Sequence, residues 1–221
     1  MTTIAIIGAG PGLGAAVARR FGREGHDVAV ISRARDRADA LAARLADDGV
    51  HARGFAADVR DPEALTAALD AAGAALGPVE VLQYSPLPHK DFMKPVLDTT
   101  AADLVGPIEF SLYGPMTAVA QVLPGMRGLG RGTVLFVNGG SAVRPHPERA
   151  GTSIAFAAES VYAQLLHDTL AGDGIHAAQL IIPGAITPGD PHTDPGVLAD
   201  TLWSLHRTRD GFRHYAAPVA P

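Results

Sequence analysis

A glycine-rich segment near the start of the chain has the composition of a turn that holds a phosphate. It reads Gly8-Ala9-Gly10-Pro11-Gly12-Leu13-Gly14, between the apolar run 3–7 and a helix-like stretch. Glycine lets backbone N–H groups approach a diphosphate without a Cβ atom in the way, and the following helix adds its positive dipole. A tight turn that needs glycine only for its shape is the alternative. The context favours a dinucleotide-diphosphate site formed by Gly8, Gly10, Pro11, Gly12, Leu13 and Gly14.

The end of the second apolar run indicates which dinucleotide would bind. An acidic residue at this place hydrogen-bonds the adenosine ribose 2′-hydroxyl, whereas an arginine accommodates a 2′-phosphate. Ser32 and Arg33 occupy it, and the first acid, Asp36, follows Arg33 by three residues. The alternative is that Arg33 is a solvated residue at a helix start. We predict NADP (NADPH) rather than NAD as the cofactor.

Short apolar runs alternate with amphipathic segments along almost the whole chain. The strands and helices that these segments form must position the glycine-rich turn and Arg33. Such alternation is typical of βαβ units and predicts an α/β fold, a doubly wound parallel sheet of about seven strands with helices on both faces. Loops at the carboxyl ends of such strands line the ligand crevice, which here includes 86–95 and 187–195. The expected strands are 3–7, 28–32, 50–57, 79–84, 133–138, 175–182 and 212–216.

The composition limits the class of protein. A length of 221 residues predicts a single domain, 1–221, and the 47% apolar share excludes general disorder. The net charge of −5 argues against nucleic-acid or anionic-membrane partners and leaves a small-molecule substrate. There is no cysteine, and the nine histidines show no metal-site spacing, so no metal is predicted. Without a signal segment or an apolar run of about 18 residues, the expected location is cytoplasmic.

The order and spacing of these motifs resemble those of the short-chain dehydrogenase/reductase family over nearly the whole chain. The resemblance rests on Gly8-x-x-x-Gly12-x-Gly14, on Asp58-Val59 after the third strand, on 134–141 and on 182–187. It implies a Rossmann fold and a homodimer or homotetramer built on long helices around 107–127 and 153–170. It also implies adenine contacts by Asp58 and Val59 and further cofactor contacts by Ser85, Pro86, Asn138, Pro183, Gly184, Ile186 and Thr187.

The family's proton-transfer pair is missing. In the family a tyrosine acts as general acid or base, and a lysine four residues later lowers its pKa and binds the nicotinamide ribose. The only lysines, Lys90 and Lys94, precede the serine expected at the catalytic position, Ser141, so no Tyr-x-x-x-Lys can follow it. A gap-free register puts Thr152 at the tyrosine position and Phe156 at the lysine position. Because a positioned acid or base contributes ~10²–10⁴-fold, an ordinary ketone reductase would be severely impaired.

Several side chains could replace the lost tyrosine, and each has a simpler explanation. Tyr84 ends the fourth strand and could equally pack in the core, His146 could be a surface residue, and Glu159 could face solvent or an interface. The candidate catalytic residues are Ser141, Thr152, Tyr84 and His146. The expected function is hydride transfer from NADPH to a small carbonyl, imine or enone by a non-standard site. The alternatives are an inactive dinucleotide- or metabolite-binding protein and a redox-neutral enzyme that uses the same pocket.

Overall fold

Seven strands form one sheet in the order β3-β2-β1-β4-β5-β6-β7. The computed structural model describes residues 2–218, and every strand pair within them is parallel. The strands are β1 (Thr3–Ile7), β2 (Asp27–Ser32), β3 (Ala52–Ala56), β4 (Val79–Tyr84), β5 (Gly132–Gly139), β6 (Ile175–Ile182) and β7 (Arg213–Tyr215).

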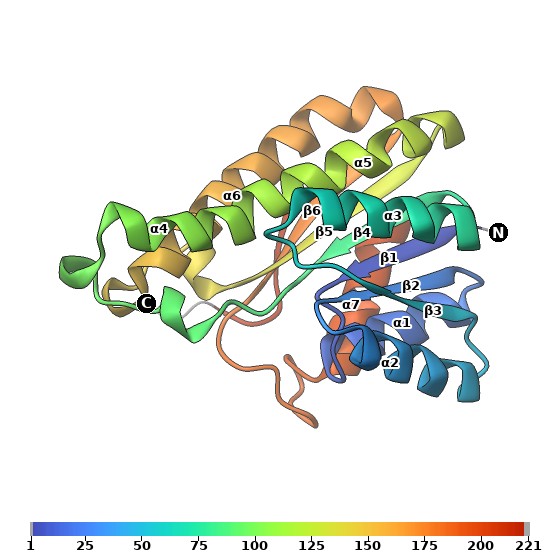
Figure 1. Cartoon of the computed structure of the whole chain (residues 1–221), viewed down its shortest axis with the longest axis horizontal. Helices are drawn as coiled ribbons and strands as arrows, with labels where there is room; N and C mark the ends of the chain where they lie inside the picture. The colour runs from blue at the N-terminus through green and yellow to red at the C-terminus, as the bar shows by residue number, and fades with distance from the viewer. Residues whose placement is uncertain (1, 219–221) are drawn as a thin grey trace.

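Helices cover both faces of the sheet, as Figure 1 shows. One face carries α1 (Leu13–Arg23), α2 (Arg35–Asp47) and α7 (Pro195–Thr208), and the other carries α3 (Pro62–Leu76), α4 (Ala101–Ile108), α5 (Gly114–Leu129) and α6 (Ala150–Leu170). In β1, Ile4 and Ile6 join the apolar core under α1, whereas Ala5 and Ile7 join the core under α3. Burial on both faces explains why this strand is apolar throughout. The predicted doubly wound α/β fold is confirmed.

All seven expected strands are present, with small differences at their ends. The third was expected to start at Val50 but starts at Ala52, because the Val50 N–H donates to the Leu45 carbonyl and closes the turn after α2. The seventh comprises only 213–215. Within the expected domain 1–221, residues 1 and 219–221 lie outside the described residues.

The helix expected around 107–127 is interrupted. Between α4 and α5 the chain forms a five-residue π-helix, Glu109–Tyr113, whose wider turns are frequent at functional sites. The second expected long helix is α6, which begins at Ala150, before the predicted start. No helix among the described residues is long and apolar enough to cross a membrane.

The sheet order places the loops that carry the predicted motifs beside one another. The chain reverses its direction of travel across the sheet between β1 and β4, and ligands of such sheets bind outside the carboxyl ends of the strands at this point. The loops after β1, β2 and β4 therefore meet at one edge. The amino ends of the strands, at the right in Figure 1, form the opposite edge.

Candidate cofactor and active site

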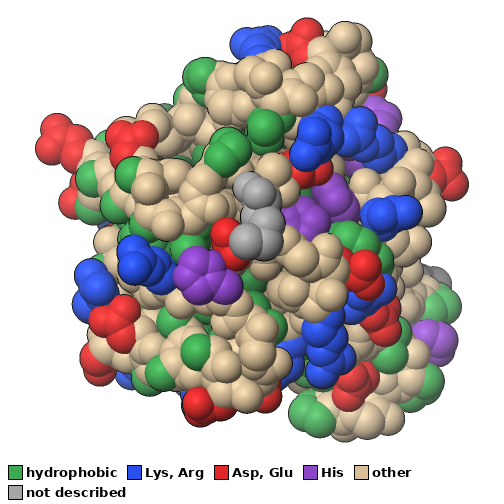
Figure 2. All heavy atoms as spheres, turned by 90° about the vertical axis from the view of Figure 1, so that its right-hand side faces the viewer, with side chains coloured by type: hydrophobic (Ala, Val, Ile, Leu, Met, Phe, Trp, Pro, Cys, Tyr) green, Lys and Arg blue, Asp and Glu red, His purple; other side chains and the backbone are tan. Residues whose placement is uncertain are grey.

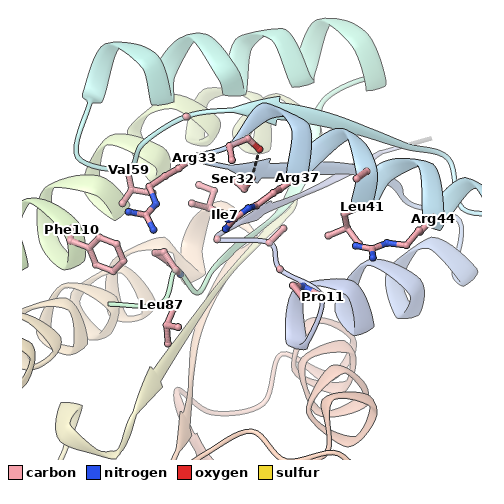
Figure 3. A pocket seen from close by; sticks show the side chains of 17 residues that line it. Ile7, Pro11, Ser32, Arg33, Arg37, Leu41, Arg44, Val59, Leu87 and Phe110 are labelled. Atoms are coloured by element: carbon pink, nitrogen blue, oxygen red, sulfur yellow. Dashed lines mark hydrogen bonds between the residues drawn. The ribbon is translucent and has the colours of Figure 1, made fainter. Parts of the chain in front are cut away.

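A cleft of about 740 Å³ lies at this switch point, and we call it the glycine-loop cleft. Figure 3 shows that its walls come from the loop after β1, the start of α2 and the segment after β4. Of the residues predicted to bind cofactor, it is lined by Gly8, Gly10, Pro11, Ser32, Arg33, Val59 and Pro86. The structure thus brings together motifs that are separated in the sequence.

The glycines of this loop serve two different purposes. Gly8 has φ +84°, and a Cβ atom there would lie 2.5 Å from the Pro86 backbone nitrogen. A Cβ at Gly14 would lie 2.8 Å from the Ala9 Cα, so this position also needs glycine for packing. Gly10 and Gly12, in contrast, have no atom within 4 Å of a Cβ position. Their open surface leaves room for a ligand against the backbone.

The N-terminus of α1 is prepared for an anion. Gly12 precedes the helix without a side-chain cap, and the first turn contains no acidic residue. The first N–H groups of a helix have no partners within the helix, and its dipole is positive at this end. Leu13 is buried under the loop and fixes this end of the helix. The cleft therefore has a natural place for a diphosphate.

Three arginines line the cleft, of which sequence reasoning named only one. Arg33, Arg37 and Arg44 all border it, and Arg33 and Arg37 extend toward its centre in Figure 3. Within residues 2–218 none of the three forms an ion pair. Arg33 precedes α2, whereas Arg37 and Arg44 lie seven residues apart on one face of this helix, and that spacing was the signal for them. The arrangement suits a ligand with more than one phosphate.

The rest of this cleft is mostly apolar. Val59, Leu87 and Phe110 form one wall, and Val59 is buried. The neighbouring Asp58 does not line the cleft; it is exposed, and its Oδ1 accepts the Arg60 N–H at 3.0 Å. The Ser32 hydroxyl donates to the Ala34 carbonyl at 3.0 Å and so shapes the turn before α2.

A second group of expected site residues lies at or beside the carboxyl ends of β5 and β6; we call Ser141, Thr152 and the loop 183–187 the Ser141 region. Ser141 is half-buried in a single helical turn, Gly140–Ala142. A Cβ atom at Gly140 would lie 3.6 Å from the Pro183 Cα, so the loop 183–187 borders this turn. Gly184, Ile186 and Thr187 on that loop are exposed. None of these residues lines the glycine-loop cleft.

Thr152 is covered rather than open. It is buried in the first turn of α6, and its hydroxyl points to the Phe92 carbonyl at 3.5 Å. The Ala150 N–H donates to the Lys94 carbonyl at 2.9 Å, so the segment after β4 lies directly on the start of this helix. One turn further, Phe156 packs with Ala142 and Ile181. The position expected for a lysine therefore belongs to an apolar cluster.

Tyr84 is a core residue. Only 1% of it is exposed, and its hydroxyl donates to the Phe110 carbonyl. Gly114 bonds back to Glu109, and Pro115 has no N–H, so the π-helix leaves the Phe110 carbonyl without a backbone donor. Burial raises the pKa of Tyr84 well above its usual value. The structure thus favours a packing role for Tyr84, because its hydroxyl is already hydrogen-bonded to the Phe110 carbonyl and is harder to ionise than a free phenol.

His146 supports its own loop. Its imidazole Nδ1 accepts the Glu148 N–H at 3.2 Å, and its backbone N–H donates to the Ser153 hydroxyl at 3.0 Å. The residue is exposed, and its bonds hold the segment between Ser141 and α6. Ser85, another expected cofactor residue, donates its backbone N–H to the Ile7 carbonyl at 3.0 Å and extends the β1–β4 pairing.

Glu159 is buried, contrary to the solvent or interface position considered from the sequence. Only 1% of it is exposed, the Asn138 amide donates to its Oε2 at 3.0 Å, and its Oε1 has no partner among the described residues. Burial raises the pKa of this carboxyl well above its usual value, although the Asn138 bond opposes the shift. The amide N–H of Asn138, an expected cofactor residue, is therefore already hydrogen-bonded to a buried carboxyl.

A chain of side-chain hydrogen bonds continues from this pair toward the surface. Gln179 donates to the Asn138 oxygen at 2.8 Å, and its own oxygen accepts Ser160 and the exposed Arg213, both at 2.9 Å. The partners lie on β5, β6, β7 and α6 and are remote in the sequence. Sequence analysis therefore could not identify this network, which replaces apolar packing between α6 and the sheet.

Comparisons with known proteins agree with this architecture. The short chain dehydrogenase family model matches residues 2–192. A fatty acyl-CoA reductase of Mycobacterium tuberculosis is 25% identical over 188 residues, which make up 84% of this chain and 63% of that protein. This chain thus spans less than two thirds of that relative's length.

Solved structures extend the likeness. A short-chain dehydrogenase from Rhodopseudomonas palustris superposes with a TM-score of 0.85 at 25% identity, covering 98% of each chain. A metagenomic short-chain oxidoreductase in complex with NADP superposes with a TM-score of 0.83 at 20% identity, covering 97% of this chain and 94% of the other. Because the matched family segment includes the glycine loop, the central strands and Ser141, the chain belongs to the short chain dehydrogenase family.

Proposed function

We propose that this chain is an NADP-dependent oxidoreductase that transfers hydride to a small carbonyl, imine or enone. The observation that carries the proposal is the glycine-loop cleft, where an uncapped helix N-terminus meets Arg33, Arg37 and Arg44. The diphosphate would lie against Gly10 and Gly12, and Arg33 with Arg37 would hold the 2′-phosphate. When bound, the nicotinamide supplies the hydride.

The Ser141 region would receive the substrate. Ser141 is half-buried beside the loop 183–187 and can donate a hydrogen bond to a substrate oxygen or nitrogen. Thr152 could add only a weak second contact, since Phe92 covers it. Because the Tyr84 hydroxyl is bonded within the core, this phenol does not assist proton transfer, so substrates that need little acid help fit this site best.

The test is NADPH oxidation, followed spectroscopically with a panel of activated ketones, cyclic imines and enones. We expect turnover for at least one class, faster with NADPH than with NADH. Turnover restricted to unactivated ketones would contradict the proposed substrate class. Absence of turnover throughout the panel, in a protein that binds NADPH, would replace it by the second candidate.

The second candidate is a binding protein for a dinucleotide or metabolite that has lost catalysis. It is favoured by the apolar packing of Phe156 and by the segment that covers Thr152. This function predicts NADPH binding as tight as in the first candidate but no chemical step. A redox-neutral enzyme is the third possibility, distinguished by product formation with no change in the oxidation state of NADPH.

We further propose that two or four copies of this chain associate through α5 and α6. Val161 and Leu165 on α6 are 60% and 58% exposed, and Tyr113 before α5 is also exposed. Such apolar side chains on neighbouring long helices suit contact with a second copy. Sedimentation should show a homodimer or homotetramer that Leu165→Glu dissociates. A single domain spanning 1–221 and a cytoplasmic location remain predictions from the sequence.

A further inference from the structure

Three potential metal ligands from distant parts of the sequence meet at the edge opposite the glycine-loop cleft. His26 lies just before β2, Glu80 is in β4 near its start, and His206 is in the last turn of α7. One ligand atom of each residue lies within 4.8 Å of the ligand atoms of the other two. Figure 2 looks onto this edge and shows histidine side chains near its centre. Because the residues are far apart in the chain, no sequence spacing reveals them.

The strongest indication that this cluster binds an ion comes from His26. Both of its ring nitrogens are buried, and apart from a weak interaction with the Phe21 carbonyl neither forms a hydrogen bond among the described residues. Buried polar groups in folded proteins are almost always paired, and an exception points to a water or an ion. A neutral imidazole has one nitrogen with a free electron pair, which makes it a good ligand for a transition metal.

His206 is oriented as metal-binding histidines commonly are. Its Nδ1 is 2.9 Å from the Thr133 hydroxyl, and the pair is buried. When Nδ1–H donates to that hydroxyl, Nε2 carries the free electron pair. Burial lowers the pKa of His206 to about 4 and also lowers that of His26, so both rings are neutral at pH 7. Neutral imidazole is the form that binds metals.

Glu80 provides the negative charge. Its Oε1 accepts Arg131 Nε at 3.0 Å. Burial raises the pKa of Glu80, but the hydrogen bonds from Arg131 and Thr2 and the charge of Arg131 together lower it overall, which keeps the carboxylate ionised. Arg131 is half exposed and can turn into solvent when a cation takes its place.

Aromatic rings enclose the cluster. Phe21 and Trp203 contact the His26 ring at centroid distances of 5.6 and 5.9 Å. These apolar walls restrict the approach of water and hold the imidazole in place. The competing explanation is an aromatic cluster beside a surface ion pair, without any metal.

We propose that His26, Glu80 and His206 bind one divalent transition-metal ion, for which Zn²⁺ is the best match. Two imidazoles and one carboxylate are an established zinc donor set, which leaves one tetrahedral position for water. The ion would tie the segment before β2 and the end of α7 to β4. The ion would lie at the edge away from the glycine-loop cleft, so it is independent of the proposed function.

The experiment is a metal titration of the chelator-treated full chain. Calorimetry with ZnCl₂ should give one ion per chain, and the melting temperature should rise. CoCl₂ should give the intense visible bands of tetrahedral cobalt. Absence of both the heat and the cobalt bands would overturn the proposal.

Variants locate the site. Glu80→Gln and His206→Gln should each weaken zinc binding at least tenfold, and Thr133→Val should weaken it about 10- to 100-fold. The matched control is His192→Ala, which removes an exposed histidine and should leave binding unchanged. Equal binding by wild type, Glu80→Gln and His206→Gln would show adventitious surface binding and refute the site. Circular dichroism identifies folded variants, and the wild-type cobalt spectrum decides the matter even if a variant does not fold.

Discussion

The glycine-loop cleft and the Ser141 region lie at the same edge of one sheet but differ in character. The first has a positive φ at Gly8, an uncapped helix end and three arginines without ionic partners among the described residues. In the second, Thr152 lies beneath the segment after β4, and the lysine position holds a buried phenylalanine. The contrast accords with the proposed function, in which the elements expected for cofactor binding are open to a ligand while the positions expected for proton transfer are buried.

The largest effect is expected from crowding the glycine loop. Gly8→Ala would place a Cβ against the Pro86 backbone at positive φ, which should destabilise the fold by about 2–4 kcal/mol and abolish NADPH binding. The matched change Gly12→Ala meets no atom within 4 Å and should weaken NADPH binding without loss of stability. Urea denaturation and calorimetry measure both. Equal stability of the two variants would contradict the assignment of Gly8 to packing and of Gly12 to ligand binding.

The next largest effect concerns chemistry at the Ser141 region. Ser141→Ala should lower kcat on the order of 100-fold, because a hydrogen bond to the reacting oxygen or nitrogen is lost. The NADPH dissociation constant should stay the same, since this residue does not line the glycine-loop cleft. Steady-state kinetics with a substrate from the panel checks this. An unchanged kcat would remove Ser141 from the site.

A smaller effect tests cofactor selectivity. Arg33→Ala should weaken NADPH about 10- to 100-fold, the value of a charged hydrogen bond, and leave NADH binding unchanged. Arg35→Ala is the matched control, because Arg35 is paired with Asp39 at 2.7 Å and does not line the cleft. Calorimetry with both dinucleotides provides the measurement. If NADPH and NADH weaken equally, Arg33 does not recognise the 2′-phosphate.

The smallest effect is a pH dependence from Glu159. Its pKa in the folded chain is raised above the ordinary 4.5 by burial, so above that pH the unfolded state releases a proton that the folded state keeps. Stability from this group is therefore lost as pH rises from about 4.5 toward the folded pKa. Relative to wild type, Glu159→Gln should gain stability with rising pH in urea denaturation. Parallel stability curves would show that Glu159 does not titrate in this way.

The fold was largely predictable because its signals are local. β1, β2, β4, β5 and β6 are short, largely apolar runs, and the Asp61 carboxylate that accepts the Ala64 N–H at 2.9 Å marks the start of α3 within a few residues. The glycine loop and Arg33 were predictable for the same reason, since strand, turn and helix follow one another. The structure then brought them together at the switch point.

The remaining site features depend on partners remote in the sequence. Tyr84 is fixed by a carbonyl that the π-helix before Pro115 leaves free, and no pattern near Tyr84 indicates this. Glu159 is buried against Asn138 on β5, whose side-chain oxygen accepts Gln179 on the neighbouring β6. Arg37 and Arg44 are the exception, since their spacing of seven residues in a predicted helix was visible in the sequence.

Calorimetric titration of the chain with NADPH and with NADH tests the central claim most directly. The glycine-loop cleft should give saturable NADPH binding at one site per chain, with at least tenfold weaker binding of NADH. A titration with no heat and no rise in melting temperature for either dinucleotide would show that this cleft no longer holds the cofactor.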